Sequence, residues 1–184
     1  MNKLSFNILP SPETNDHEIR ILVDDQDFLG DDYLGVDPVS FFSQSFDSEG
    51  ILNIGRCTCG DEGCGNFPVN VSFNQNTVSW TNNSQLNLQF DKNEYLNAID
   101  RAKNDHSWED INRKVERLTT EVLRNSQTKN GCIFDWASAR IKDKQITLSY
   151  SKNRNQELFY LSWDGQTEKN IKLNAERFLK TNLK

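Results

Sequence analysis

The chain has 184 residues, of which 21 are basic and 27 acidic, so its formal net charge at pH 7 is −6. One domain is the default organisation at this length, and 11 Phe, 4 Trp and 4 Tyr supply the large apolar side chains that disordered chains lack. No stretch approaches the roughly 20 apolar residues of a membrane span, and the acidic balance disfavours nucleic acid, whose binding relies on clustered Lys and Arg. The first residues alternate instead of running apolar as a signal peptide does, so we expect a cytoplasmic protein with no membrane partner.

Apolar residues at every second position predict short strands in the first half of the chain. The first two strands run from Lys3 to Leu9 and from Glu18 to Val23, and a polar loop at 10–17 joins them. A short helix follows, with Asp37 as its N-cap and Pro38 as its first residue. Four further strands form an antiparallel meander with Asn-rich turns: Ile51–Arg56, Val69–Phe73, Thr77–Trp80 and Leu86–Phe90.

The apolar period changes to that of a helix between residues 91 and 125. Asp91 followed by Glu94 predicts the start of one helix, and Ser107 predicts the start of a second. The second has an apolar stripe: Trp108, Ile111, Val115, Leu118 and Val122. Its charged face, between residues 109 and 121, is expected to be solvated. The stripe covers about two heptads, fewer than a coiled coil needs, so we expect this helix to pack on its own sheet.

Alternation returns from residue 130 and predicts three more strands. The residues that share a face are Cys132, Phe134 and Trp136 in the first strand, Ile146, Leu148 and Tyr150 in the second, and Leu158, Tyr160 and Ser162 in the third. Asp164 and Gly165 predict a hairpin turn. Asn174 is expected to cap a short C-terminal helix.

These elements together predict an α+β fold of antiparallel sheets of short strands, with a central two-helix insertion and a short C-terminal helix. We expect one continuous domain over 1–184. Its parts are the N-terminal strands and a cysteine turn at 1–90, the helices at 91–125, and a meander and helix at 130–184.

The most specific feature is a cysteine-rich segment: Arg56-Cys57-Thr58-Cys59-Gly60-Asp61-Glu62-Gly63-Cys64-Gly65. In a reducing compartment such a cluster favours metal or redox chemistry over disulfides. Cys57 and Cys59 would point to one face of a strand, and the glycines would let the backbone bring Cys64 beside them. Three thiolates that converge in this way predict a tetrahedral zinc site.

A closed structural zinc site needs a fourth ligand. Cys132 is the leading candidate because it starts another predicted strand, and Asp61, His17 and His106 come behind it. The C-x-C-x4-C spacing differs from the paired C-x2-C knuckles of most structural sites, so two alternatives stay open. One is a packed turn whose cysteines act as small buried hydrophobes. The other is a redox-reactive or disulfide-forming site, in which Arg56 lowers the pKa of a neighbouring thiol.

The cysteine segment resembles the R-C-x-C-G-x-x-G-C-G signature of a family of uncharacterised bacterial proteins. Val69–Val71 and Val78–Trp80 resemble the V-x-V and V-x-W strands that follow this signature, and Asp105–Glu109 resembles a later D-x-S-W-E. The resemblance spans roughly the middle half of the chain. It implies that the cysteine turn is a shared feature, and it implies nothing about a substrate because no activity is established for the family.

A second feature is acidic, with six aspartates between residues 24 and 37. The segment does not match an EF-hand calcium-binding loop, because Leu29 and Val36 would take positions that require oxygen ligands. Apolar anchors between acidic groups suit a protein interface, since the anchors supply affinity and the charges steer a basic partner. The expected partner-binding residues are Asp24, Asp25, Asp27, Phe28, Asp31, Asp32 and Tyr33. The alternative is a solvated loop whose aromatic side chains fold back on the core.

The sequence gives no support to a catalytic site. Asp105, His106 and Ser107 are contiguous, whereas a catalytic triad is assembled from separate elements. Nucleotide-binding and metalloprotease motifs are absent from the sequence. We therefore expect a non-enzymatic, acidic, cytoplasmic protein-binding domain, such as an immunity protein that neutralises a basic toxin. The alternatives are a zinc-stabilised module that contacts a ligand or nucleic acid, and an unrecognised enzyme; the oligomeric state is open.

Overall fold

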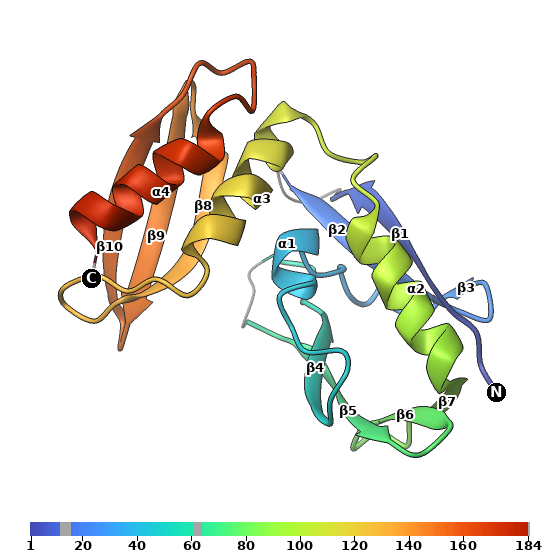
Figure 1. Ribbon diagram of the computed structural model, residues 1–184. Helices are drawn as coiled ribbons and strands as arrows, with labels where there is room; N and C mark the ends of the chain where they lie inside the picture. Colours follow the sequence, from blue (N-terminus) through green and yellow to red (C-terminus); the bar gives the residue numbers. More distant parts are fainter. Residues whose placement is uncertain (12–15, 61–63, 184) are drawn as a thin grey trace. The chain divides into compact units, whose positions relative to one another are not determined.

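The computed structural model describes residues 1–11, 16–60 and 64–183 (Figure 1). The chain forms two compact units, Met1–Trp108 and Glu109–Lys184, and each has its own hydrophobic core. Helices and antiparallel sheets of short strands make an α+β fold, as predicted. The expectation of one continuous domain stays a prediction. Part of the 10–17 loop lies outside the described residues, and so do Asp61 and Gly63.

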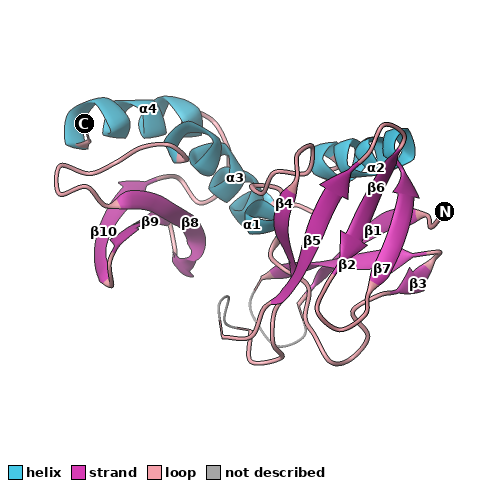
Figure 2. Ribbon diagram, turned by 90° about the horizontal axis from the view of Figure 1, so that it is seen from below, coloured by secondary structure: helices cyan, strands magenta, loops and turns pink. Residues whose placement is uncertain are grey.

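The first unit contains two antiparallel sheets. One has the order β1-β2-β3: β1 (Leu4–Pro10), β2 (His17–Val23) and β3 (Gln26–Asp27). The other has the order β4-β5-β6-β7, and Figure 2 shows its strands side by side: β4 (Gly50–Gly55), β5 (Phe67–Phe73), β6 (Thr77–Thr81) and β7 (Asn87–Asp91). Two isolated bridges lie beside these sheets: Asn2, just before β1, pairs with Phe90 of β7, and Leu34 pairs with Arg56, which follows β4.

Two helices complete the first unit, α1 (Pro38–Phe41) and α2 (Lys92–Asn104), and both begin at the predicted cap. The Asp37 carboxylate accepts a hydrogen bond from the backbone N–H of Val39 at 2.9 Å. The Asp91 carboxylate accepts two at the start of α2. Helix α2 contacts β1, β6 and β7, so it covers apolar side chains of both sheets. The largest fully buried side chains of this core include Ile21, Phe41, Ile54, Trp80, Phe90 and Tyr95.

The second unit is a three-stranded antiparallel sheet with two helices on one face (Figure 2). Its elements are α3 (Ile111–Leu123), β8 (Ile133–Lys142), β9 (Gln145–Lys152), β10 (Asn155–Ser162) and α4 (Ile171–Asn182), and the strand order is β10-β9-β8. Helix α3 contacts β8 and α4, which confirms that it packs on its own sheet. The fully buried side chains of this core are Val115, Leu123, Ile146, Leu148, Tyr150 and Ala175.

The start of α3 differs from the prediction. The helix begins at Ile111, and its N-cap is Asp110, whose carboxylate accepts a hydrogen bond from the backbone N–H of Arg113 at 2.8 Å. Ser107 was the expected cap, and that expectation is wrong. Its own N–H donates to the Asp105 carboxylate at 2.9 Å, so the segment before α3 forms an Asx turn instead of a first helical turn.

The chain between β10 and α4 also departs from the prediction. Helix α4 begins at Ile171, so Asn174 lies inside it, and the residue before the helix is Asn170 in a left-handed conformation. Asp164 and Gly165 make a turn, but it leads into α4 and does not join two strands. The Asp164 carboxylate accepts hydrogen bonds from the backbone N–H groups two and three residues further on, each at 2.8 Å.

Trp136 does not share the face of Phe134. The pairing of β8 with β9 shifts register between these two residues, and the extra residue of this bulge turns the following side chain to the other face of the sheet. Phe134 is buried, whereas 37% of Trp136 is exposed. A strict alternation from Cys132 could not reveal this change, because a bulge leaves no mark in the apolar pattern.

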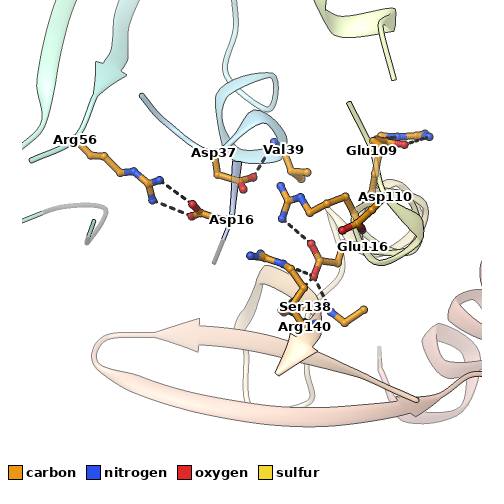
Figure 3. A network of polar contacts seen from close by, with 12 residues as sticks. Asp16, Asp37, Val39, Arg56, Glu109, Asp110, Glu116, Ser138 and Arg140 are labelled. Carbon is orange, nitrogen blue, oxygen red and sulfur yellow. Dashed lines mark hydrogen bonds and ion pairs between the residues drawn. The ribbon is translucent and has the colours of Figure 1, made fainter. Parts of the chain in front are cut away.

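The charged face of α3 is not solvated throughout, because Arg113 and Glu116 are buried. One oxygen of the Glu116 carboxylate accepts from Arg113 Nη1 at 2.6 Å. The other accepts from the Ala139 N–H at 2.7 Å, from Arg140 Nε at 3.0 Å and from the Ser138 hydroxyl at 3.2 Å (Figure 3). Two guanidinium groups and a backbone N–H therefore offset the cost of burying one carboxylate.

We predict that Glu116→Gln lowers the free energy of unfolding by about 3–5 kcal/mol, because it leaves Arg113 buried without its counter-charge. The matched control is Glu121→Gln, also on α3, whose carboxylate is 38% exposed and pairs with Arg117 and Lys172. This control should lose no more than about 1 kcal/mol. Urea titration followed by circular dichroism measures the free energy of unfolding of both variants. Equal losses would show that the buried network stabilises the fold no more than an exposed ion pair does.

Candidate metal centre

The structure brings three of the predicted ligands together in the first unit. The sulfur atoms of Cys57, Cys59 and Cys64 all lie within 4.8 Å of one another, and none of the three cysteines forms a disulfide. Sulfur atoms around one tetrahedral zinc, each about 2.3 Å from the metal, lie about 3.8 Å apart. The upper limit of 4.8 Å on the observed separations is compatible with this value, so the three cysteines form a cluster that could hold a metal ion.

The backbone around the cluster explains why the three thiols converge. Strand β4 ends at Gly55, and the N–H of Gly60 then donates to the Cys57 carbonyl at 3.0 Å, which closes a turn. Gly60 has a φ of +85°, a conformation that side chains disfavour. Gly65 lies against Cys57, since a Cβ atom on this glycine would be 3.1 Å from the Cys57 Cβ. The second glycine therefore permits the close return of the chain.

Arg56 anchors the start of this turn through a buried guanidinium group. Its Nε donates to the Gly35 carbonyl at 2.9 Å, and its Nη1 donates to the Gly60 carbonyl at 3.0 Å. Both Nη atoms also contact the Asp16 carboxylate, at 3.1 and 3.2 Å (Figure 3). This charge therefore faces a carboxylate, and its effect is to hold the turn in place.

The Cys64 thiol holds its proton tightly. Hydrogen bonds with Cys57 and Cys59, together with the negative charge that these sulfurs acquire when ionised, raise the pKa of the Cys64 thiol to about 11. Three neighbouring thiolates repel one another, so they ionise together only when a cation offsets their charge. The cluster can therefore exchange protons for a metal ion.

Among the described residues, the other predicted ligands Cys132, His17 and His106 are not part of this cluster. Cys132 is buried in the core of the second unit, where its thiol donates to the Glu157 carboxylate at 3.3 Å. Burial comes first among the causes that raise the pKa of this thiol, followed by the contact with Glu157. The His17 ring lies at a tilt against the Trp108 ring, with centroids 5.0 Å apart, and Asp61 lies outside the described residues. The assignment of Cys132 as the fourth ligand stays a prediction.

The start of the acidic segment is a hairpin turn between β2 and β3. Asp24 and Asp25 have φ values of +53° and +63°, the pattern of a two-residue type I′ turn. The Asp24 carboxylate accepts from the Lys3 N–H at 2.7 Å and from Asn2 at 2.7 Å, and these contacts lower its pKa. Asp25 forms an exposed ion pair with Lys3. Both side chains thus have partners within the first unit.

The rest of the acidic segment folds back in part on the first unit. Asp27 pairs with Arg20 at 2.7 Å. Phe28 and Tyr33 stack on Phe67, with ring centroids 6.0 and 5.0 Å apart. These contacts match the alternative of a loop whose aromatic side chains pack on the core. Two of the expected partner-binding residues, Asp31 and Asp32, are exposed.

The chemistry of the cysteine turn depends on a residue that the sequence did not single out. Asp16 is forty positions away from Arg56, and no local pattern links the two. Gly35 is equally indispensable, because a Cβ at this position would lie 2.1 Å from the Ile19 carbonyl oxygen. An invariant glycine or a co-varying acidic position in related sequences would be the signal that could identify them.

Comparisons with family models, with curated proteins and with solved structures find no match to this chain. The resemblance to a bacterial family with the same cysteine signature therefore stays a prediction. Among the described residues, no helix has both the length and the apolar run that crossing a membrane requires.

We predict that Arg56→Lys lowers the free energy of unfolding by about 2–3 kcal/mol, because one ammonium group cannot reach all the oxygen acceptors of the planar guanidinium. Hydrogen–deuterium exchange should also become faster in the 57–60 turn. Arg101→Lys, an exposed position on α2, is the control and should change stability by less than about 0.5 kcal/mol. Unchanged exchange in the turn would contradict the anchoring role of Arg56.

Proposed function

We propose that this protein is a zinc-binding module in which Cys57, Cys59 and Cys64 hold one Zn²⁺. The observation that carries the proposal is the convergence of the three sulfur atoms to within 4.8 Å on a turn that is anchored at Arg56. Zinc binds thiolate readily, whereas calcium and magnesium prefer oxygen ligands, so the three sulfurs favour zinc. The metal would order the turn and present it to a ligand.

The exposure of the cysteines supports this proposal over a packed turn. Cysteines that serve as small hydrophobes are among the most buried residues of a protein. Cys59 and Cys64 are exposed, and Cys57 is only partly buried. A redox site needs two thiols, whereas three converge here. The cytoplasm is the compartment that we propose for the protein, since it keeps such thiols reduced.

Three protein sulfurs leave one tetrahedral position to be filled. In closed structural sites a fourth side chain fills it, whereas in open sites a water molecule or a ligand does so. Cys132 remains our proposed fourth ligand for a closed site. If it is not a ligand, the zinc would expose one coordination position, which a nucleophilic or anionic group could occupy.

We predict that protein expressed with added zinc binds one Zn²⁺ per chain, measured by native mass spectrometry. Cys57→Ser and Cys59→Ser should lower the affinity by at least about 100-fold, because each removes a thiolate. Replacing zinc with Co²⁺ should give the intense sulfur-to-metal charge-transfer absorption of thiolate ligands.

Cys132→Ser is the matched control, since it removes the one cysteine outside the cluster. Retained zinc in this variant with weaker binding in the other two would define a three-thiolate site, and loss of zinc in all three would define a four-thiolate site. A folded chain that binds no zinc under these conditions contradicts the proposal.

A second proposed function is recognition of a basic protein partner, such as a toxin, through the acidic segment. The net charge of −6 and the exposed Asp31 and Asp32 support it. Because Asp24, Asp25 and Asp27 have partners within the first unit, Asp31 and Asp32 are the residues that should face the partner.

We predict that the double variant Asp31→Lys and Asp32→Lys loses a partner that the parent chain captures from its native cells. Charge reversal at rim positions acts mainly on the association rate, so rates from surface plasmon resonance should fall by at least about tenfold. Glu49→Lys, which reverses an exposed charge outside this segment, is the control. Equal capture by all three proteins would exclude the segment as the interface.

A further inference from the structure

Strand β10 forms one edge of the sheet in the second unit. It pairs with β9 in one continuous register, from Asn155 opposite Lys152 to Ser162 opposite Gln145, with no bulge. Edge strands are normally protected by bulges, by Pro or Lys, or by short length. Strand β10 has eight residues, of which Glu157 alone is charged, and it contains neither Pro nor Lys. Its outer backbone groups are therefore a template for another strand.

The opposite edge strand of the same sheet, β8, is protected by irregular pairing. Strand β8 has two register shifts, one after Phe134 and one after Ser138, and an isolated bridge joins Gln127 to Ile133. Such irregularities twist an edge and prevent regular pairing. Within the described residues of this sheet, β10 is thus the edge that is open to a partner strand.

Apolar side chains lie beside this open edge, on the face of the sheet that the helices leave uncovered. Phe159 and Leu161 pack on the core below α4, so Leu158 and Tyr160 project from the other face and are 44% and 59% exposed. Leu158 is opposite Ser149, which in turn is opposite Trp136. Leu158 and Tyr160 therefore give this face two exposed apolar side chains at the free edge of the sheet.

We propose that β10 pairs antiparallel with β10 of a second copy of this chain, so that two sheets join into one. A twofold axis perpendicular to the sheet keeps each side chain on the same face of the joined sheet. Only registers that pair residues of the same face are therefore allowed. In the register centred on Phe159, Leu158 lies opposite Tyr160 of the second copy, and the reverse pair forms by symmetry. Aromatic–aliphatic pairs of this kind stabilise neighbouring strands.

Charge complementarity selects a second copy as the occupant. Arg154 lies in the turn before β10, and Asp164 lies just after the strand; both are exposed. The register centred on Phe159 brings the turn that contains Arg154 to the end of the strand pair at which Asp164 of the second copy lies, and this happens twice across the axis. The hydrogen bonds from Thr167 lower the pKa of Asp164 to about 2, so its carboxylate is charged at neutral pH. No like charges oppose each other in this register.

Sedimentation equilibrium of the full chain tests the proposal, with a chelator and a reducing agent present so that neither metal nor disulfides join the copies. The parent chain should form dimers with a micromolar dissociation constant. Leu158→Lys should raise this constant at least about tenfold, because a lysine protects an edge strand. Ile141→Lys, on β8, is the matched control with an exposed apolar side chain, and it should leave the constant unchanged.

Two further measurements keep the test independent of any one variant. Hydrogen exchange of the parent chain should slow in β10 as the protein concentration rises, while exchange in β8 stays constant. Arg154→Glu should weaken the dimer, and added salt should reduce the difference from the parent. A chain that is monomeric at all concentrations overturns the proposal. So does a dimer that Ile51→Lys, on edge strand β4, dissociates and Leu158→Lys does not.

Discussion

A buried guanidinium group needs a carboxylate and carbonyl oxygens around it, and at Arg56 this need determines the path of the chain beside the cysteine cluster. The group binds Asp16, Gly35 and Gly60, which come from three different segments. It therefore fixes where strand β4 ends and where the turn begins. A charge buried without such partners would cost several kcal/mol, so the turn and the strands around it stabilise one another through Arg56.

The two kinds of cysteine in this chain illustrate how environment sets thiol chemistry. Cys132 lies in a core, where burial raises the pKa of its thiol and keeps it protonated. Cys64 is exposed, and its neighbouring sulfurs are what raise its pKa. A metal ion offsets the mutual repulsion of the thiolates and so allows the exposed cluster to ionise. It does not reduce the cost of ionising a buried thiol. The raised pKa values of the two thiols thus have different causes, and the mutual repulsion in the exposed cluster is the one that a metal ion relieves.

The sequence predicts most of this fold because apolar period and caps are local signals. Asp37 and Asp91 each cap a helix as expected, and the convergence of Cys57, Cys59 and Cys64 follows from short spacing and glycines. Three kinds of feature escape local reasoning. Asp110 competes with Ser107 as a cap, and only tertiary packing decides between them. The burial of Glu116 depends on strand β8, which comes more than fifteen residues later. The pairing of Asp16 with Arg56 depends on the whole first unit.

The sheet edges of the described chain differ in a way that sequence composition alone does not show. Strand β4 has a bulge between Asn53 and Gly55, and the end of β7 is paired with Asn2 through a bridge. Strand β8 is irregular at two points. Each device interrupts the ladder that a foreign strand would need. Strand β10 combines a regular register with exposed Leu158 and Tyr160 and with oppositely charged residues beyond its two ends. Because an unprotected edge is an aggregation hazard, a closed pairing of two such edges satisfies their hydrogen bonds and ends further growth.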